Sequence, residues 1–319
     1  LIEPIYLINN SFVDNNYGVT GGDNMFALNN LIAGTTKTAM KNVDGNSIIS
    51  YNNHWLNGVD FDNCNKEEAT IFYGVPLLDE NFRITSGSAC IIKGTRLFIW
   101  QGDTVLNISP KSYVGSAPDI GAFEYDLNDD LTELNLSADT IPGEINLTWY
   151  AGDGANLLGF EVERSKGGIY MAKIAFVENQ GNVTASNKYR YADTGLLPDF
   201  YYYRLKRFDS DGRARLSSVL QVELPAPEMY ALPPNYPNPF NSGTKIEYHL
   251  PTAGYVTLKI FNSLGQEIHT LVDSERAAGY HLTHWNGRDR AKQRVASGTY
   301  FLELRVGSFR TTRKLMLLQ

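Results

Sequence analysis

The chain has 319 residues, of which 43% are apolar, and a formal net charge of −7 at pH 7. This length suggests about two or three domains, with enough apolar residues to build their cores. No run of about 18 apolar residues occurs, so the sequence predicts no membrane span. The acidic balance argues against nucleic-acid binding, which needs a clustered basic face.

Cys64 and Cys90 are the only cysteines. Two cysteines exclude a disulfide-rich scaffold and a zinc site of four thiolates. In an exported protein they could form one disulfide, but sequence spacing cannot decide this because the geometry is unknown.

Residues 1–126 contain a weak internal repeat. The pairs Asn9-Asn10, Asn29-Asn30 and Asn52-Asn53 recur at intervals of 20 and 23 residues, a period typical of solenoid coils. Asparagine tolerates the left-handed backbone of a sharp corner, and its amide can bond the same side chain one coil above. We therefore expect stacked asparagine ladders in the end of a right-handed parallel β-helix.

A resemblance supports this interpretation. Residues 117–125 read Ala-Pro-Asp-Ile-Gly-Ala-Phe-Glu-Tyr, and residues 86–90 read Ser-Gly-Ser-Ala-Cys. These strings resemble the closing part of secreted pectin-lyase-like β-helix proteins. The segment departs from that pattern between Ile91 and Ser116, where an apolar run is inserted. Because only about three coils are visible and a solenoid needs a cap at each end, we expect the native polypeptide to extend N-terminally.

Residues 131–224 predict an antiparallel sandwich. Apolar and polar residues alternate in Glu144–Trp149 and Phe160–Arg164, as a half-solvated sheet requires. Together with the Tyr-Tyr-Tyr-Arg-Leu string at residues 201–205, they resemble a fibronectin type III domain. The resemblance implies that Trp149 is the core aromatic residue and that the module spaces and stiffens a secreted protein.

Residues 234–319 predict a second small sandwich. Thr244–Leu250, Val256–Phe261 and Tyr300–Val306 are β-rich runs bounded by turn-forming residues. Pro237 and Pro239 favour a stiff, extended segment before the first strand.

The same segment resembles the Ig-like, type A C-terminal sorting domain of cargo of the bacterial type IX secretion system. The resemblance rests on Asn-Tyr-Pro-Asn-Pro-Phe-Asn at residues 235–241, Trp-Asn-Gly-Arg-Asp at 285–289, Val-Ala-Ser-Gly-Thr-Tyr at 295–300 and the basic, apolar tail. It implies export through the periplasm of a Gram-negative bacterium and recognition by the secretion machinery. The residues implicated are Asn238, Pro239, Phe240, Gly265, Gly298, Tyr300, Lys314, Leu315, Leu317 and Leu318. The alternative role for these residues is maintenance of the fold.

Candidates for catalysis and metal binding are few. No histidine lies between His54 and His249, so a triad in the front half would need His54, for which a surface or ladder position is the preferred interpretation. His281 and His284 differ by three in a predicted strand and point to opposite faces, so they cannot hold a metal jointly.

Asp60 and Asp62 are the one close carboxylate pair in the coil region, and a solvated turn is preferred over a catalytic role. A calcium loop at residues 60–65 is disfavoured because Cys64 stands where an oxygen ligand is needed. We predict no catalytic residue, no metal and no cofactor.

Two classes of function stay open. The preferred one is an all-β, non-catalytic structural or adhesive protein, secreted or held at the cell surface, with an extracellular filament as a variant. The alternative is the C-terminal portion of a carbohydrate-active β-helix enzyme, a lyase or hydrolase, with catalytic coils upstream of Leu1. Besides the secretion machinery, the candidate partners are polysaccharide and copies of the chain itself.

Overall fold

The computed structural model describes residues 3–126, 134–151, 157–179 and 187–318, so Leu1 lies outside the described residues. In this part of the chain the fold is all-β, without an α-helix and with one short 3-10 turn at Glu68–Thr70. None of its helices is long and apolar enough to cross a membrane. The chain divides into two compact units, one comprising residues 1–138, 147–191 and 200–222, the other residues 139–146, 192–199 and 223–319.

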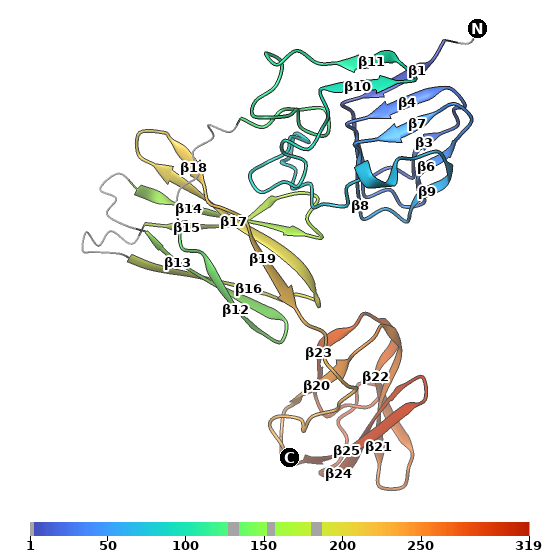
Figure 1. Cartoon of the computed structure of the whole chain (residues 1–319). Helices are drawn as coiled ribbons and strands as arrows, with labels where there is room; N and C mark the ends of the chain where they lie inside the picture. The colour runs from blue at the N-terminus through green and yellow to red at the C-terminus, as the bar shows by residue number, and fades with distance from the viewer. Residues whose placement is uncertain (1–2, 127–133, 152–156, 180–186, 319) are drawn as a thin grey trace. The chain divides into compact units, whose positions relative to one another are not determined.

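The first unit begins with three short parallel sheets, which Figure 1 shows in blue. Each sheet takes one strand from each of three successive turns of the chain. The first is β1 (Ile5–Ile8), β4 (Met25–Leu28) and β7 (Ile48–Ser50); the second is β2 (Ser11–Val13), β5 (Leu31–Ala33) and β8 (Asn53–Trp55); the third is β3 (Tyr17–Thr20), β6 (Thr38–Val43) and β9 (Val59–Cys64). In-register stacking buries a shared core that includes Ala27, Ile32, Met40 and Ile49.

Sharp corners join the first sheet to the second. They hold residues with positive φ, namely Asn9 (54°), Asn29 (56°) and Tyr51 (54°). In the first two turns the corner residue is the first asparagine of the pair, as the tolerance of asparagine for the left-handed region predicts. In the third turn the corner residue is Tyr51. The third asparagine pair is thus displaced by one position relative to the other two, which a search for repeated Asn-Asn strings does not reveal.

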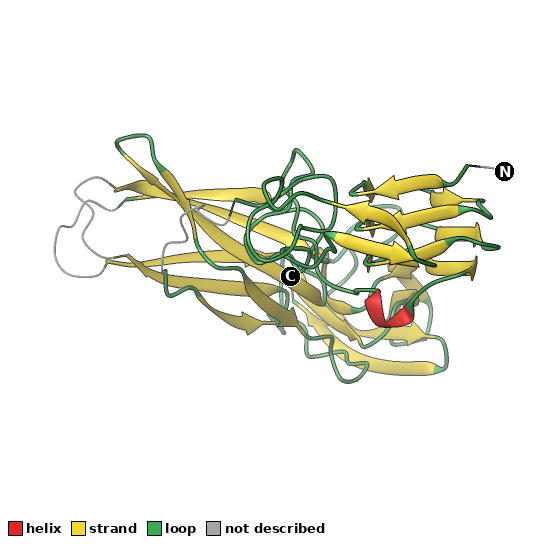
Figure 2. Ribbon diagram, turned by 45° about the horizontal axis from the view of Figure 1, so that its top comes forward, coloured by secondary structure: helices red, strands yellow, loops and turns green. Residues whose placement is uncertain are grey.

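The apolar insertion forms an antiparallel hairpin of β10 (Leu97–Trp100) and β11 (Asp103–Asn107). Phe98 and Leu106 pack against Phe26, Leu28 and Ile48 of the first parallel sheet. The insertion therefore buries an apolar face of these strands instead of distorting the stack. Figure 2 shows the stacked strands from a second direction.

Antiparallel strands of a sandwich follow. One sheet has the order β12 (Ser137–Ile141), β13 (Glu144–Ala151), β16 (Asn187–Thr194); the other has the order β15 (Ala172–Glu178), β14 (Leu157–Lys166), β17 (Asp199–Asp209), β18 (Ala214–Leu216), with β19 (Leu220–Leu224) also on β17. Trp149 is fully buried, stacks on Tyr189 and meets Phe160 edge-on, with ring centroids 5.7 and 5.6 Å away. Trp149 therefore lies in the core, as predicted, together with Phe160 and Tyr189.

The second unit ends in another antiparallel sandwich. One sheet pairs β20 (Thr244–Leu250) with β23 (Gly279–Trp285), and the other has the order β22 (Glu267–Arg276), β21 (Gly254–Asn262), β24 (Gly298–Val306), β25 (Phe309–Leu317). Trp285, Leu258 and Leu304 lie in its core with less than 2% exposure. The three strand runs predicted here coincide with β20 or lie inside β21 and β24.

Candidate functional sites

An asparagine ladder crosses the three parallel turns. Asn10 Nδ2 donates to Asn30 Oδ1 at 3.1 Å, and Asn30 Nδ2 donates to Asn52 Oδ1 at 2.9 Å. Each Oδ1 also accepts the backbone N–H of the preceding asparagine, at 3.0 and 2.7 Å. Asn30 and Asn52 are fully buried, so the ladder satisfies backbone groups that strand pairing leaves open at the corner.

The other three asparagines of the repeat have different partners. Asn29 exchanges two hydrogen bonds with the backbone of Thr95, and Asn53 exchanges two with Gly74. Asn9 holds a corner. The structure therefore brings together only Asn10, Asn30 and Asn52 of the six predicted ladder residues, while Asn29 and Asn53 fasten the loops that follow the sheets.

His54 is buried, with 1% of the residue exposed, which excludes a surface position. Its ring lies 4.3 Å from that of Phe61, and its Nδ1 lies 3.5 Å from Asp60 Oδ1, too far for a good hydrogen bond. Burial lowers the pKa of His54, and the Asp60 carboxylate offsets this only in part. Burial favours a higher pKa for Asp60, but the His54 ring and the Asn57 amide outweigh it, and that pKa is lowered.

Asp60 and Asp62 have separate partners on β9. Asp60 accepts a hydrogen bond from Asn57 at 2.9 Å, whereas Asp62 pairs with Lys41 at 2.7 Å. Within the described ranges, no three His, Cys, Asp or Glu side chains gather as metal ligands would. The two carboxylates therefore do not act on a common centre in this structure.

The two cysteines are free thiols in different clusters. The half-buried Cys64 donates to Met40 O at 3.3 Å, while Cys90 is buried beside Ile120 and Leu31. Burial raises the pKa of the Cys90 thiol to about 12. The disulfide that the sequence left open is not formed.

Residues 235–241, here called the lead segment, lie against residues 314–318, here called the tail, which comprise the end of β25 and Leu318. Asn238 Nδ2 donates to Lys314 O at 3.2 Å, and its Oδ1 accepts Met316 N–H at 2.9 Å. Phe240 pairs in parallel with Leu317 through two backbone hydrogen bonds of 3.0 and 2.7 Å. Seventy-odd residues of chain separate two motifs that form one surface.

The predicted sorting residues divide by exposure within this surface. Phe240, Leu315 and Leu317 are buried in the core, with Tyr300, whose hydroxyl donates to Ala296 O at 2.7 Å. Asn238, Pro239, Lys314 and Leu318 are exposed, and a cavity of about 410 Å³ lies between Pro237, Pro239, Phe240, Asn241 and Leu318. Gly265 stands in a turn at φ 79°, and Gly298 begins β24. The exposed members are the ones that a partner could contact.

A joint within the first unit links the loop after β9 to the turn between β14 and β15. Leu77 and Leu78 donate backbone hydrogen bonds to Gly168 and Ile169, at 2.9 and 2.6 Å, and Leu78 accepts one from Met171 at 2.8 Å. Ile169 also packs into a core cluster with Leu31 and Leu78. These contacts, which we call the joint, fix the turn against the loop by both main-chain and apolar contacts.

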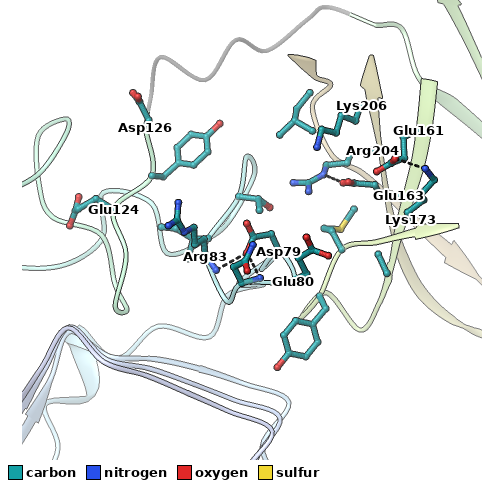
Figure 3. Close-up of a pocket in the computed structure, with 18 residues that line it drawn as sticks. Asp79, Glu80, Arg83, Glu124, Asp126, Glu161, Glu163, Lys173, Arg204 and Lys206 are labelled. Atoms are coloured by element: carbon teal, nitrogen blue, oxygen red, sulfur yellow. Dashed lines mark hydrogen bonds and ion pairs between the residues drawn. The ribbon is translucent and has the colours of Figure 1, made fainter. Parts of the chain in front are cut away.

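Beside the joint lies a cavity of about 660 Å³. Its lining comes from residues 79–85 and 124–126 on one side and from β14, β15 and β17 on the other, and Figure 3 shows its charged side chains. Arg204 is its most buried charged residue, 4% exposed, and is ion-paired with Glu163. Sequence reasoning missed this cavity because its walls derive from segments that carry no shared local motif.

Comparison with known proteins gives one family match. Residues 240–307 match the family of FlgD Ig-like domains, which shows an Ig-like domain in this part of the chain. No curated protein matches the chain.

Many solved structures are similar to this chain, and three examples show how low the similarity is. Dimeric latent PorU from Porphyromonas gingivalis has 10% identity and a TM-score of 0.24, covering 68% of this chain and 22% of that chain. The fibronectin(III)-like modules of CbhA from Clostridium thermocellum have 16% identity and a TM-score of 0.21, covering 58% and 94%. Red sea bream transglutaminase has 11% identity and a TM-score of 0.21, covering 60% and 32%. This chain thus spans about a fifth of the PorU chain, and at these TM-scores the likenesses carry no functional argument.

Proposed function

We propose that this chain is a non-catalytic structural or adhesive protein, exported by the type IX secretion system to the cell surface or exterior. In this proposal residues 1–126 are the end of a right-handed parallel β-helix, residues 131–224 a fibronectin type III-like module and residues 234–319 an Ig-like sorting domain. The three parallel sheets support the first assignment, and the FlgD Ig-like match supports the Ig-like part of the last.

The contact between the lead segment and the tail carries the export proposal. Both motifs that resemble a sorting signal meet there, although they lie at opposite ends of the domain sequence. Their exposed residues include a cation, Lys314, and an apolar side chain, Leu318, which is 51% exposed. A secretion receptor could thus read charge and an apolar contact from one rigid edge without unfolding the domain.

The test must separate signalling from folding. Deleting residues 309–319 would remove β25 with the buried Leu315 and Leu317, so loss of export would only report unfolding. The double variant Lys314→Glu, Leu318→Asp changes exposed side chains and should leave the unfolding temperature nearly unchanged. We expect this variant to accumulate in the periplasm.

A matched control is Lys245→Glu, an exposed lysine on β20 with the same charge change. It should be exported normally. Normal export of the Lys314→Glu, Leu318→Asp variant would contradict the proposal, as would equal retention of the control. Turnover of a polysaccharide by the purified chain would instead favour the carbohydrate-active alternative.

A further inference from the structure

The sandwich wall of the 660 Å³ cavity has unused positive groups. Glu161 is paired with Lys173 at 2.7 Å, and Glu163 with Arg204 through the guanidinium Nε. Arg204 Nη1 is buried without a hydrogen-bond partner among the described residues. Lys206 likewise has no ion pair there, although it lies 5.5 Å from the centre of the Phe208 ring. A buried guanidinium donor without a partner is costly unless an acceptor can reach it.

The loop wall has the opposite character. Asp79 Oδ1 accepts the backbone N–H groups of Asn81 and Arg83, at 2.8 and 2.9 Å, which orders the loop. Glu80 is exposed and forms no ion pair with any described residue. In Figure 3, Arg204 and Lys206 extend from the strands into the space that Asp79 and Glu80 border from the loop. The loop wall carries four carboxylates, from Asp79, Glu80, Glu124 and Asp126, and one cation, Arg83, so it is negative on balance. The sandwich wall carries three cations, from Lys173, Arg204 and Lys206, and two carboxylates, from Glu161 and Glu163, so it is positive on balance. The cavity is therefore bipolar.

The joint holds these walls in place. Its backbone hydrogen bonds run between residues 77–78 and 168–171, next to the Asp79 loop and to the Met171 lining. A site fixed before binding loses less conformational entropy when a ligand enters. Cavities of about 300 to 1,000 Å³ are the usual size of ligand sites, so this one has room for a short stretch of polymer.

We propose that this cavity binds a peptide segment of a partner protein in which a carboxylate side chain and an amine or guanidinium side chain are neighbours. The carboxylate would accept hydrogen bonds from Arg204 and Lys206, and the cation would face Glu80 and Asp79. The carboxylates of the loop wall would repel a ligand that carries only a negative charge, and Arg204 and Lys206 would repel a ligand that carries only a positive charge. Only a ligand with both charges is therefore complementary to both walls. The proposal concerns the purified chain and does not depend on the route of export.

The experiment is a calorimetric titration of the full chain with the capped dipeptide Ac-Glu-Lys-NH2 and its charge-deleted relatives Ac-Gln-Lys-NH2 and Ac-Glu-Gln-NH2. We expect the doubly charged dipeptide to bind about tenfold more tightly than either relative, since one charge-assisted contact at a partly exposed site is worth about 1.4 kcal/mol. Lys206→Met and Glu80→Gln should each weaken its binding about tenfold. Their unfolding temperatures should stay close to wild type.

Lys188→Met is the matched control, because Lys188 lies over Tyr150 and outside the cavity. It should bind the dipeptide as the wild type does. Equal binding of the three dipeptides, no binding at all, or preferential binding of a neutral trisaccharide would overturn the proposal. Binding unaffected by both Lys206→Met and Glu80→Gln would place the ligand elsewhere and overturn it as well.

Discussion

Replacing the central residue of the asparagine ladder should destabilise the parallel sheets. Asn30 is fully buried, donates to Leu7 O and Asn52 Oδ1 at 2.9 Å each, and accepts two hydrogen bonds from Asn10. Asn30→Ala removes all four. Asn52 Oδ1 keeps the backbone N–H of residue 30, but Leu7 O and Asn10 N lose the side-chain partner.

The expected loss follows from these two contacts: the Asn10 N–H is left without a partner, whereas Leu7 O loses one hydrogen bond but keeps its place in the parallel pairing of β1 with β4. A buried polar group left without a partner costs about 1–3 kcal/mol. Because Leu7 and Asn10 are only half-buried, we expect about 2–4 kcal/mol for Asn30→Ala in total. Asn10→Ala, at the outer turn of the ladder, should cost about 1 kcal/mol.

Hydrogen exchange of the amides in β4 and β5 measures this free energy locally, which matters because a chain with several domains need not unfold in one step. The control is Asn16→Ala, since Asn16 is exposed and its side-chain oxygen accepts a hydrogen bond from the Thr36 hydroxyl at 2.8 Å. That change should cost less than about 0.5 kcal/mol. An Asn30→Ala loss no larger than that of Asn16→Ala would refute the ladder as a source of stability.

Three further predictions concern the joint, the lead segment and the buried histidine. Trp55→Phe removes the 2.6 Å hydrogen bond from the indole to Gly167 O. It should lower the free energy of local opening of the β14–β15 turn by about 1 kcal/mol, and the amides of the turn should exchange faster as a result. Asn238→Ala should likewise speed exchange of the Met316 amide that it now binds, whereas unchanged exchange would show that backbone pairing alone holds the tail. Burial lowers the pKa of His54 in the folded chain, so as the pH falls the histidine of the unfolded chain is protonated before that of the folded chain. The stability of the parallel sheets should therefore fall as the pH drops below about 6.5, the ordinary pKa of histidine. His54→Gln should flatten that fall in a comparison of unfolding curves between pH 5 and pH 8, and an identical pH profile would contradict this reasoning.

Local patterns predicted much of the sandwich structure. The run Thr244–Leu250 is β20 without change, because alternating apolar and polar residues fix both the strand and its buried face. The core position of Trp149 was implied by the resemblance to a fibronectin type III domain, and Trp149 is fully buried. The Asn-Asn repeat predicted turns of about 20 residues, yet it misplaced the third by one residue, since Tyr51 and not Asn52 takes the left-handed corner.

Sequence alone could not predict the contacts made between distant segments. His54 was expected at a surface or ladder position because its own strand gives no sign that Phe61 covers it. The cavity beside the joint depends on Asp79 and Arg204, which are far apart in the chain and belong to unrelated patterns. No sequence periodicity predicts that Asp79 and Arg204 line one cavity, because their proximity depends on the packing of distant segments.

The turn at Gly167 and Gly168 shows how little sequence signal a decisive contact can carry. A Lys-Gly-Gly string marks a hairpin turn in any sandwich, and both glycines adopt positive φ, 72° and 80°. A Cβ at Gly168 would lie 2.2 Å from Val75 Cγ1, so this glycine is also needed for close approach to the loop. Because the same turn places Ile169 in a core cluster with Leu31 and Leu78, the module does more than separate other domains. Through Ile169, its β14–β15 turn packs against the core cluster of the preceding segment.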